Sequence, residues 1–308
     1  MQPILKISLE DIKSNWKSLN TCSNGKASAV IKANAYGMGM LKVAGALLEA
    51  GCNYFYVANI NEGIELRKKY KSHKIFIAIF EGYLDGYQKT YEEYNLIPII
   101  NSLEQLERLN QYAIQENKPK AILNIDTGMN RLGLNKEETC YLIKNKDILN
   151  NINWDYIMSH LANAQEKDNH NNLIQLNKIT KFSKNFPSIK ISLANTGGIR
   201  LGKEFCLDQT RPGIGLYGID DLGKKVEKAQ RKTGTRFYDN QVSRIATTLS
   251  DGTSMTTEQI NYLTLNNTAI ANTISSASAT FNNKTIATAP DNFTLGQEAF
   301  AVYVNGCW

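Results

Sequence analysis

The sequence predicts an α/β fold, a (β/α)8 or TIM barrel followed by a C-terminal segment that does not continue the pattern. Short apolar runs alternate with amphipathic helical patterns, which is typical of parallel strands joined by right-handed crossovers. Eight such units fill about 220 residues, and this number and length match a closed barrel better than an open sheet. A doubly wound open sheet is the structural runner-up, but no GxGxxG follows the first strand.

Length and charge bound the function before any motif is considered. A chain of 308 residues can bury a large core, and we expect a barrel domain over residues 1–220 and a separate segment over 221–308. The net charge of +6 is modest and the lysines are scattered among acids, so nucleic-acid binding is not indicated. An anionic small ligand fits the charge equally well.

Membrane and metal classes are also disfavoured. No apolar run is long enough for a membrane helix and the first residues lack a signal-peptide core, which predicts a cytoplasmic protein. The five cysteines form no CxxC pair, so we expect buried thiols and neither a disulfide framework nor a metal site.

The predicted elements follow in order along the chain. Residues 3–7 form a short predicted strand, and Ser8 is typical of a helix cap because its hydroxyl can accept from the first turn. The barrel strands are then predicted at 27–32, 54–59, 75–81, 96–101, 121–126, 154–161, 189–195 and 213–219. The clearest helices between them are predicted at 41–50, 61–70, 102–116, 136–145 and 171–184.

Polar residues gather at the predicted strand ends. They are Lys32, Asn59, Asn101, Asp126, His160, Asn195 and Arg211. Barrel enzymes build their chemistry at the C-terminal ends of the strands, so the co-occurrence favours a site there. Each residue alone could equally be a structural cap.

The segment ASAVIKANAYGMGM, residues 27–40, is the most informative stretch. Its first half is a predicted buried strand that ends at Lys32, and glycines then punctuate a turn that contains Tyr36. Desolvation at a strand end disfavours the ammonium form and makes an amine a better nucleophile toward a carbonyl. The alternative for Lys32 alone is a lysine that snorkels at a strand end.

Four further motifs follow. NIDTGMNRLG, residues 124–133, is a strand end that enters a glycine turn and presents Arg131, whose planar fork suits a carboxylate. SHLA, residues 159–162, places His160 at a strand end, where a histidine is either structural or catalytic. LANTGGI and RPGIGLYG, residues 193–199 and 211–218, bring glycine amides to an anion site.

Together these motifs closely resemble those of the alanine racemases, fold-type III enzymes that use pyridoxal 5'-phosphate. The resemblance implies that Lys32 carries the cofactor as a Schiff base and acts as the base on one face of the substrate, and that Arg131 holds the substrate carboxylate. It also implies that His160 packs on the cofactor ring and that Arg211 meets the pyridine nitrogen, which favours proton exchange at the α-carbon. The cofactor phosphate would be held by Tyr36, Asn195, Thr196, Gly213 and Ile214.

The resemblance ends near Ile219. Alanine racemases continue with a β-rich domain whose tyrosine is the second acid or base in the partner subunit's site, and residues 221–308 contain no similar GYxDGY segment. This stretch is rich in Thr, Ser and Asn, which predicts partial disorder. Tyr238, Tyr262 and Tyr303 are the tyrosines there that could substitute, without support from their sequence context.

The resemblance therefore implies a racemase that interconverts L-alanine and D-alanine and supplies D-alanine for peptidoglycan, acting in the cytoplasm as a homodimer. The alternative is a pyridoxal-phosphate-binding protein without racemase turnover, because one lysine cannot serve both faces of the α-carbon. A decarboxylase would need an acid at the pyridine nitrogen, which Arg211 disfavours. A purely structural barrel would bind no cofactor.

Overall fold

The structure is a computed structural model that describes residues 7–113, 118–219, 279–281 and 284–286. The described residues from Ser8 to Ile219 lie in one compact unit. A second unit contains β8 (Ala279–Phe281), which pairs antiparallel with β9 (Lys284–Ile286). Apart from these two strands, the predictions of a polar, partly disordered tail over 221–308 and of a strand at residues 3–6 fall outside the described residues.

Seven parallel strands form one sheet in the order in which they occur in the sequence. They are β1 (Ala29–Val30), β2 (Tyr54–Val57), β3 (Phe76–Ile79), β4 (Ile97–Ile100), β5 (Lys120–Asn124), β6 (Asn153–Met158) and β7 (Lys190–Ser192). Strand residues such as Phe55, Ile77, Ile99 and Leu123 are fully buried. The sheet is therefore covered on both faces, as parallel sheets require.

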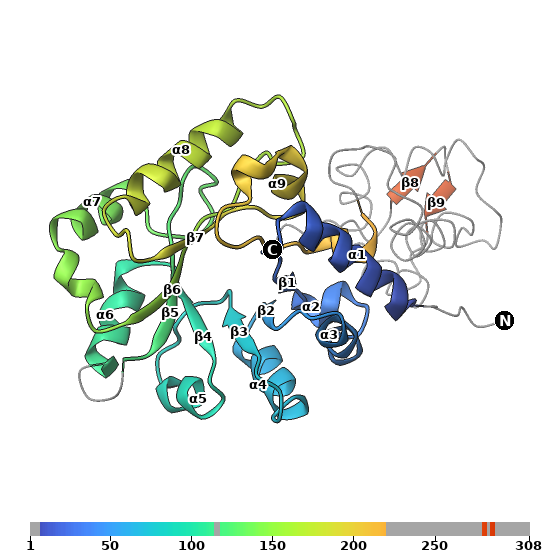
Figure 1. The fold of residues 1–308 in the computed structure, drawn as a ribbon, viewed down its shortest axis with the longest axis horizontal. Helices are drawn as coiled ribbons and strands as arrows, with labels where there is room; N and C mark the ends of the chain where they lie inside the picture. The colour runs from blue at the N-terminus through green and yellow to red at the C-terminus, as the bar shows by residue number, and fades with distance from the viewer. Residues whose placement is uncertain (1–6, 114–117, 220–278, 282–283, 287–308) are drawn as a thin grey trace. The chain divides into compact units, whose positions relative to one another are not determined.

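Helices connect the strands and lie on the outside of the sheet (Figure 1). They are α1 (Leu9–Cys22), α3 (Met40–Glu49), α4 (Ile60–Lys69), α5 (Gln88–Glu93), α6 (Leu103–Ala113), α7 (Lys136–Lys144) and α8 (Asn171–Ser183). Two short helical turns lie at strand ends, α2 (Lys32–Tyr36) and α9 (Thr196–Leu201). Single-turn 3-10 helices complete the described unit at η1 (Lys146–Leu149), η2 (Lys203–Phe205) and η3 (Ile214–Tyr217).

The ring closes through residues 209–210, which bridge to both edges of the sheet. Gln209 is bridged in parallel to Ser192 at the end of β7, and Thr210 is bridged to Ala27 before β1. The amide of Thr210 donates to the Lys26 carbonyl at 2.9 Å, and the carbonyl of Thr210 accepts from the Ser28 amide at 2.9 Å. This segment takes the eighth position, so the predicted barrel architecture is confirmed.

The predicted position of the eighth strand, 213–219, is wrong. Residues Ile214–Tyr217 form η3 instead of a strand. The backbone of Gly213 turns away from an extended path, with φ of −121° and ψ of −88°. The amides of Gly213 and Gly215 donate to the Thr196 hydroxyl at 3.2 and 3.1 Å, so they face α9 rather than a neighbouring strand.

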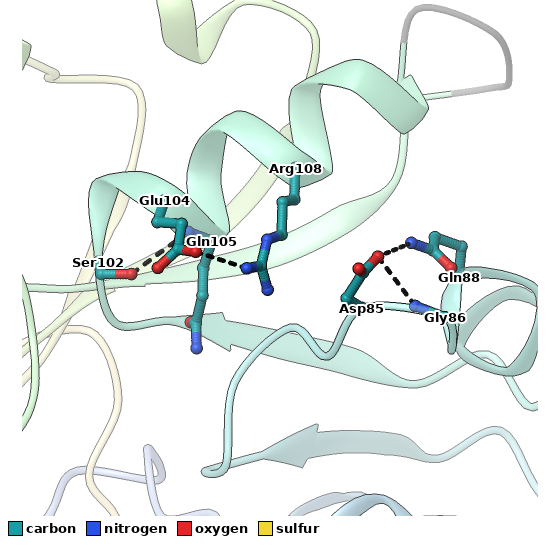
Figure 2. Close-up of polar contacts among 7 residues, drawn as sticks. All are labelled: Asp85, Gly86, Gln88, Ser102, Glu104, Gln105 and Arg108. Atoms are coloured by element: carbon teal, nitrogen blue, oxygen red, sulfur yellow. Dashed lines mark hydrogen bonds and ion pairs between the residues drawn. The ribbon is translucent and has the colours of Figure 1, made fainter.

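Helix starts follow local capping chemistry. The Ser8 hydroxyl accepts from the Asp11 amide at 3.2 Å, as the sequence predicted. Figure 2 shows the start of α6, where the Ser102 hydroxyl accepts from the Gln105 amide at 3.3 Å and Glu104 pairs with Arg108 one turn later. In the turn before α5, the Asp85 carboxylate accepts from the Gly86 amide and the Gln88 side chain (Figure 2).

Smaller differences from the prediction are informative. β1 is shorter than predicted, and Lys32 is the first residue of α2 rather than the last residue of a strand. Of the four cysteines that the structure describes, all are free, and Cys22 and Cys140 are exposed rather than buried because they lie on outward faces of α1 and α7. No helix within the described residues is long and apolar enough to cross a membrane.

Candidate active site

The candidate site lies where the C-terminal ends of the parallel strands meet. Lys32 follows β1, Arg131 follows β5, His160 follows β6 and Asn195 follows β7. Arg211 comes from the segment that closes the ring. The sequence therefore predicted the correct end of the barrel for all five residues.

His160 is the point at which the charges of the site converge. Burial lowers the pKa of its imidazole well below the ordinary value, and the positive charges of Arg211, Arg131 and Lys32 lower the pKa further. The Nε2 atom of His160 lies 3.4 Å from the side-chain nitrogen Nδ2 of Asn195. The backbone carbonyl of His160 accepts from the side-chain amide of Gln175 in α8 at 2.9 Å. The ring is consequently neutral at pH 7, and its position is fixed by one contact to the ring and one to the backbone.

Arg211 is buried, with only 2% of its surface exposed. Its guanidinium donates to the Ser192 hydroxyl at 2.6 Å and to the carbonyls of Ser159 and Leu193 at 2.5 and 3.2 Å. Burial lowers its pKa to about 10, so the group is still a cation at pH 7. Neutral acceptors therefore fix the orientation of the Arg211 guanidinium, and none of them neutralises its positive charge.

A second layer of side chains holds this guanidinium. Gln209 Oε1 accepts from the Tyr56 hydroxyl at 2.5 Å and from the Ser192 hydroxyl at 3.3 Å. The Tyr56 ring also lies under Arg211, with 5.9 Å between Cζ and the ring centroid. Burial raises the pKa of the Tyr56 hydroxyl, which keeps it protonated and able to donate.

The predicted anion-binding residues come together from three segments. The Asn195 side chain caps α9 by accepting from the Gly198 amide at 2.9 Å. The buried Thr196 hydroxyl accepts from Gly213 and Gly215 and so fixes the loop that contains Ile214. A Cβ atom added at Gly213 would lie 2.5 Å from the Tyr36 hydroxyl, which shows that only glycine permits this approach.

Lys32 begins a tight turn, residues 32–37, which we call the Lys32 turn. Its side chain is partly buried, and Nζ lies 5.9 Å from the ring centroids of both Tyr36 and Phe80. Phe80 follows β3, so two strand ends flank the amine. The Tyr36 ring in turn packs against Tyr217, with 5.1 Å between the centroids.

Arg131 is presented by a second turn, residues 126–133, which we call the Arg131 turn. The Asp126 carboxylate accepts from the amides of Gly128, Met129 and Asn130 at 2.8 to 3.1 Å. Gly128 and Asn130 have φ of 137° and 56°, as residues that tolerate the left-handed region. The Arg131 side chain is exposed. The predicted glycine turn that presents an arginine is observed.

Two of the strand-end residues noted in the sequence have local structural partners. The Asn59 side chain caps α4 by accepting from the Glu62 amide at 3.0 Å. Asn101 donates to the Phe80 carbonyl at 3.1 Å and accepts from Asn124 at 2.8 Å. His73 and His170 are exposed. Within the described residues, no group of three or more His, Cys, Asp and Glu side chains could hold a metal ion.

Sequence reasoning missed the residues that support the site. Tyr56, Gln209 and Ser192 carry no motif, and periodicity alone assigns them to the core. Glu62 follows Asn59 at the spacing of a capping box, which would have predicted a local contact at the start of α4. Its carboxylate instead contacts the Lys32 turn, as described below.

Comparison with known proteins gives one consistent result. A family model described as alanine racemase, N-terminal domain, matches residues 7–221. The alanine racemase of Rickettsia typhi is 38% identical over 247 residues, which are 80% of this chain and 60% of that protein. The alanine racemase of Rickettsia canadensis is 42% identical over 220 residues, which are 71% of this chain and 62% of that protein.

Solved structures agree. A crystal structure of alanine racemase from Bartonella henselae with covalently bound pyridoxal phosphate superposes with a TM-score of 0.68 at 39% identity, covering 71% of this chain and 64% of that one. Alanine racemase from Pseudomonas aeruginosa superposes with a TM-score of 0.63 at 27% identity. The chain thus spans less than two thirds of the length of the relatives it matches.

Proposed function

Because the chain belongs to the alanine racemase N-terminal domain family over residues 7–221, we propose that it is a pyridoxal-phosphate-dependent racemase that interconverts L-alanine and D-alanine. The observation that carries the proposal is that Lys32, Arg131, His160 and Arg211 lie at the same end of the barrel, where the three cations lower the pKa of the His160 imidazole. All the charged groups that shift the pKa of this imidazole are cations. Such a site suits a cofactor phosphate and a substrate carboxylate, which are both anions.

The described residues fit the cofactor. The space beside Gly213 and the Tyr36 hydroxyl would be filled by the Cβ atom of any other residue type. The Thr196 hydroxyl fixes the orientation of the Gly213 amide by accepting its hydrogen bond. In the proposal, Tyr36, Asn195, Thr196, Gly213 and Ile214 hold the phosphate. Glycine there lets the backbone approach the phosphate closely.

Lys32 and Arg131 are the proposed catalytic residues. Lys32 would hold the cofactor covalently through Nζ, and the Nζ amine, once the substrate amine has displaced it, would remove or return the α-proton on one face of the substrate. When bound, pyridoxal phosphate withdraws electrons from the α-carbon and so makes that proton acidic. Arg131, which is exposed, would orient the substrate carboxylate through its two parallel donors.

His160 and Arg211 are the proposed partners of the cofactor ring. A neutral imidazole offers a flat face without adding a fourth cation to the site. Arg211 remains a cation and offers donors only, so it disfavours a proton on the ring nitrogen. A less electron-deficient ring restricts the chemistry to proton exchange at the α-carbon.

Racemisation also needs an acid or base on the opposite face of the α-carbon. Tyr238, Tyr262 and Tyr303, named as candidates from the sequence, lie outside the described residues. The second candidate function is therefore a pyridoxal-phosphate-binding protein without turnover. A homodimer, a cytoplasmic location and a role in D-alanine supply for peptidoglycan belong to the racemase proposal.

The test uses the purified full chain with added pyridoxal phosphate. Absorption spectra report cofactor bound through a lysine, and chiral chromatography reports D-alanine formed from L-alanine. Lys32→Ala is the test variant, and Lys42→Ala, an exposed lysine on α3, is the matched control. Far-ultraviolet circular dichroism checks that both variants fold.

We expect a protein-bound absorption band and D-alanine formation that both disappear in Lys32→Ala and persist in Lys42→Ala. A Lys32-dependent band without D-alanine would overturn the racemase proposal in favour of the binding protein. Wild-type protein without a band would overturn both.

A further inference from the structure

The residues that follow Lys32 have an uncommon backbone. Ala33, Asn34, Ala35 and Tyr36 have φ between 52° and 57°, in the left-handed region that side chains with a Cβ avoid. The turn ends at Gly37 with φ of 84°. Four consecutive residues of this kind persist only where surrounding contacts over-determine the conformation.

One of those contacts comes from Glu62 of α4, outside the turn. Its Oε1 atom accepts from the Asn34 amide at 2.9 Å, in the middle of the left-handed turn. Its Oε2 atom accepts from the Ala58 amide at 2.8 Å, at the end of β2. One carboxylate therefore joins the turn to the neighbouring strand end by two charge-assisted hydrogen bonds.

The helix fixes the position of this carboxylate. The Glu62 amide donates to the Asn59 cap at 3.0 Å, which places Glu62 in the first turn of α4. The Asn34 side chain adds a second link by accepting from the Met40 amide at 2.8 Å. The turn is thus held at its centre by α4 and at its exit by the start of α3.

The conformation of the turn sets two functional atoms at once. Lys32 Nζ lies 5.9 Å from the centroid of the Tyr36 ring, and the Tyr36 hydroxyl lies against Gly213. Relaxing residues 33–36 to right-handed backbone would change the path of the chain between Lys32 and Tyr36. The Lys32 amine and the Tyr36 hydroxyl would then no longer keep these positions relative to the Tyr36 ring and to Gly213.

We propose that Glu62 is a positioning residue that holds the left-handed Lys32 turn and thereby places the Lys32 amine for cofactor binding. The part that concerns the cofactor rests on the function proposed above. The role of Glu62 in holding the turn is independent of that function, because it depends only on hydrogen bonds to backbone amides.

The test variant is Glu62→Gln, which keeps the size of the side chain but replaces one acceptor by a donor that faces an amide. The matched control is Glu138→Gln, because Glu138 plays the same local part in α7. Its carboxylate accepts from the Asn135 amide at 2.8 Å and from the Leu103 amide at 3.0 Å, on the other side of the barrel from β1.

The first measurement is amide hydrogen exchange by NMR on the protein without cofactor. We expect the Asn34 amide to exchange about 10- to 100-fold faster in Glu62→Gln, the ratio that one charge-assisted hydrogen bond supports. In Glu138→Gln the acceleration should fall on Leu103 and Asn135 instead. Unchanged exchange at Asn34 in Glu62→Gln would overturn the proposal.

The second measurement is the affinity for pyridoxal phosphate from the Lys32-dependent absorption band. We expect about a tenfold weaker affinity in Glu62→Gln and less than about a twofold change in Glu138→Gln. Equal losses in the two variants would mean that Glu62 acts on stability alone and would overturn the positioning role. A wild-type protein without a band overturns the proposed function, and the exchange data then decide the role of Glu62 by themselves.

Discussion

The Lys32 turn and the Arg131 turn lie at the same end of the barrel, after β1 and β5, and each carries a cation of the candidate site. Both depend on a carboxylate that accepts backbone amide protons. In the Arg131 turn the carboxylate is Asp126 of the turn itself. In the Lys32 turn it is Glu62, supplied by the helix after the next strand.

The two turns also differ in how they reach the left-handed region. The Arg131 turn uses Gly128, Asn130 and Gly133, which adopt positive φ readily. The Lys32 turn uses Ala33, Ala35 and Tyr36, which avoid positive φ, together with Asn34, and it ends in Gly37. A turn with compatible residues needs only local contacts, whereas a turn with incompatible residues needs support from elsewhere in the fold.

The largest expected effect that separates the turns is steric. A Cβ at Gly133 would lie 2.9 Å from the Asp126 amide and the Ile125 carbonyl carbon, and φ there is 107°. We expect Gly133→Ala to lower the free energy of unfolding by about 3 kcal/mol, because rigid backbone must shift and the alanine is strained. Urea unfolding followed by circular dichroism measures the loss.

Gly37→Ala is the counterpart in the Lys32 turn. Its φ is 84°, but no atom lies within 4 Å of the added Cβ. We expect a loss of about 1 kcal/mol from backbone strain alone. Equal losses at the two glycines would show that close backbone contact does not distinguish the turns.

The next effect concerns the local carboxylate. Asp126→Ala removes an acceptor shared by three amides, and we expect about 2 kcal/mol lower free energy of unfolding. Asp126→Asn keeps one carbonyl oxygen and should lose about half as much. If urea unfolding shows no difference between Asp126→Ala and the wild type, the turn does not depend on its own carboxylate.

The smallest effect is electrostatic and concerns the pKa of His160, which the cations of both turns lower. The native pKa of this imidazole is depressed, so below about pH 6.5 the unfolded chain binds a proton that the native protein does not. The free energy of unfolding should therefore fall as the pH falls from 6.5 toward the native pKa, by about 1 kcal/mol per pH unit. Urea unfolding at pH 7.5 and 5.5 tests this, and His160→Gln should lose that part of the dependence.

The pKa of His160 also allows the cations of the two turns to be compared. Arg131 lowers the His160 pKa more than Lys32 does. NMR titration of the His160 ring should consequently show a larger upward shift of the pKa in Arg131→Ala than in Lys32→Ala. The reverse order would mean that the Lys32 amine lies closer to the imidazole than the Arg131 guanidinium.

Much of this molecule is predictable from local sequence. The alternation of apolar runs and amphipathic helical patterns predicted the parallel barrel. The apolar runs correspond to buried strands, and the amphipathic helices place their apolar faces against the sheet. The Ser8 cap and the glycine turn before Arg131 follow from hydroxyl and glycine chemistry at short range. The placement of Lys32, His160 and Asn195 at one end follows because parallel strands all end on the same side.

The prediction was wrong where long-range contacts overrode local pattern. The run RPGIGLYG is apolar enough for a strand, but the Thr196 hydroxyl accepts hydrogen bonds from two of its backbone amides. The run forms η3 instead of a strand. The eighth position of the ring passes to residues 209–210, whose polar side chains carry no strand signal. The Glu62 carboxylate accepts from the amides of Asn34 and Ala58, and no local pattern indicates its contact with Asn34.

The sequence by itself determined which residues are the candidates for the chemistry and at which end of the barrel they lie, since residue type and strand order are properties of the chain. The tertiary structure decided how each cation is held. Asp126 lies within its own turn, so its contacts are local. Glu62 reaches the Asn34 amide only after β1, β2 and α4 have packed together, and no pattern within a single segment encodes a contact between segments.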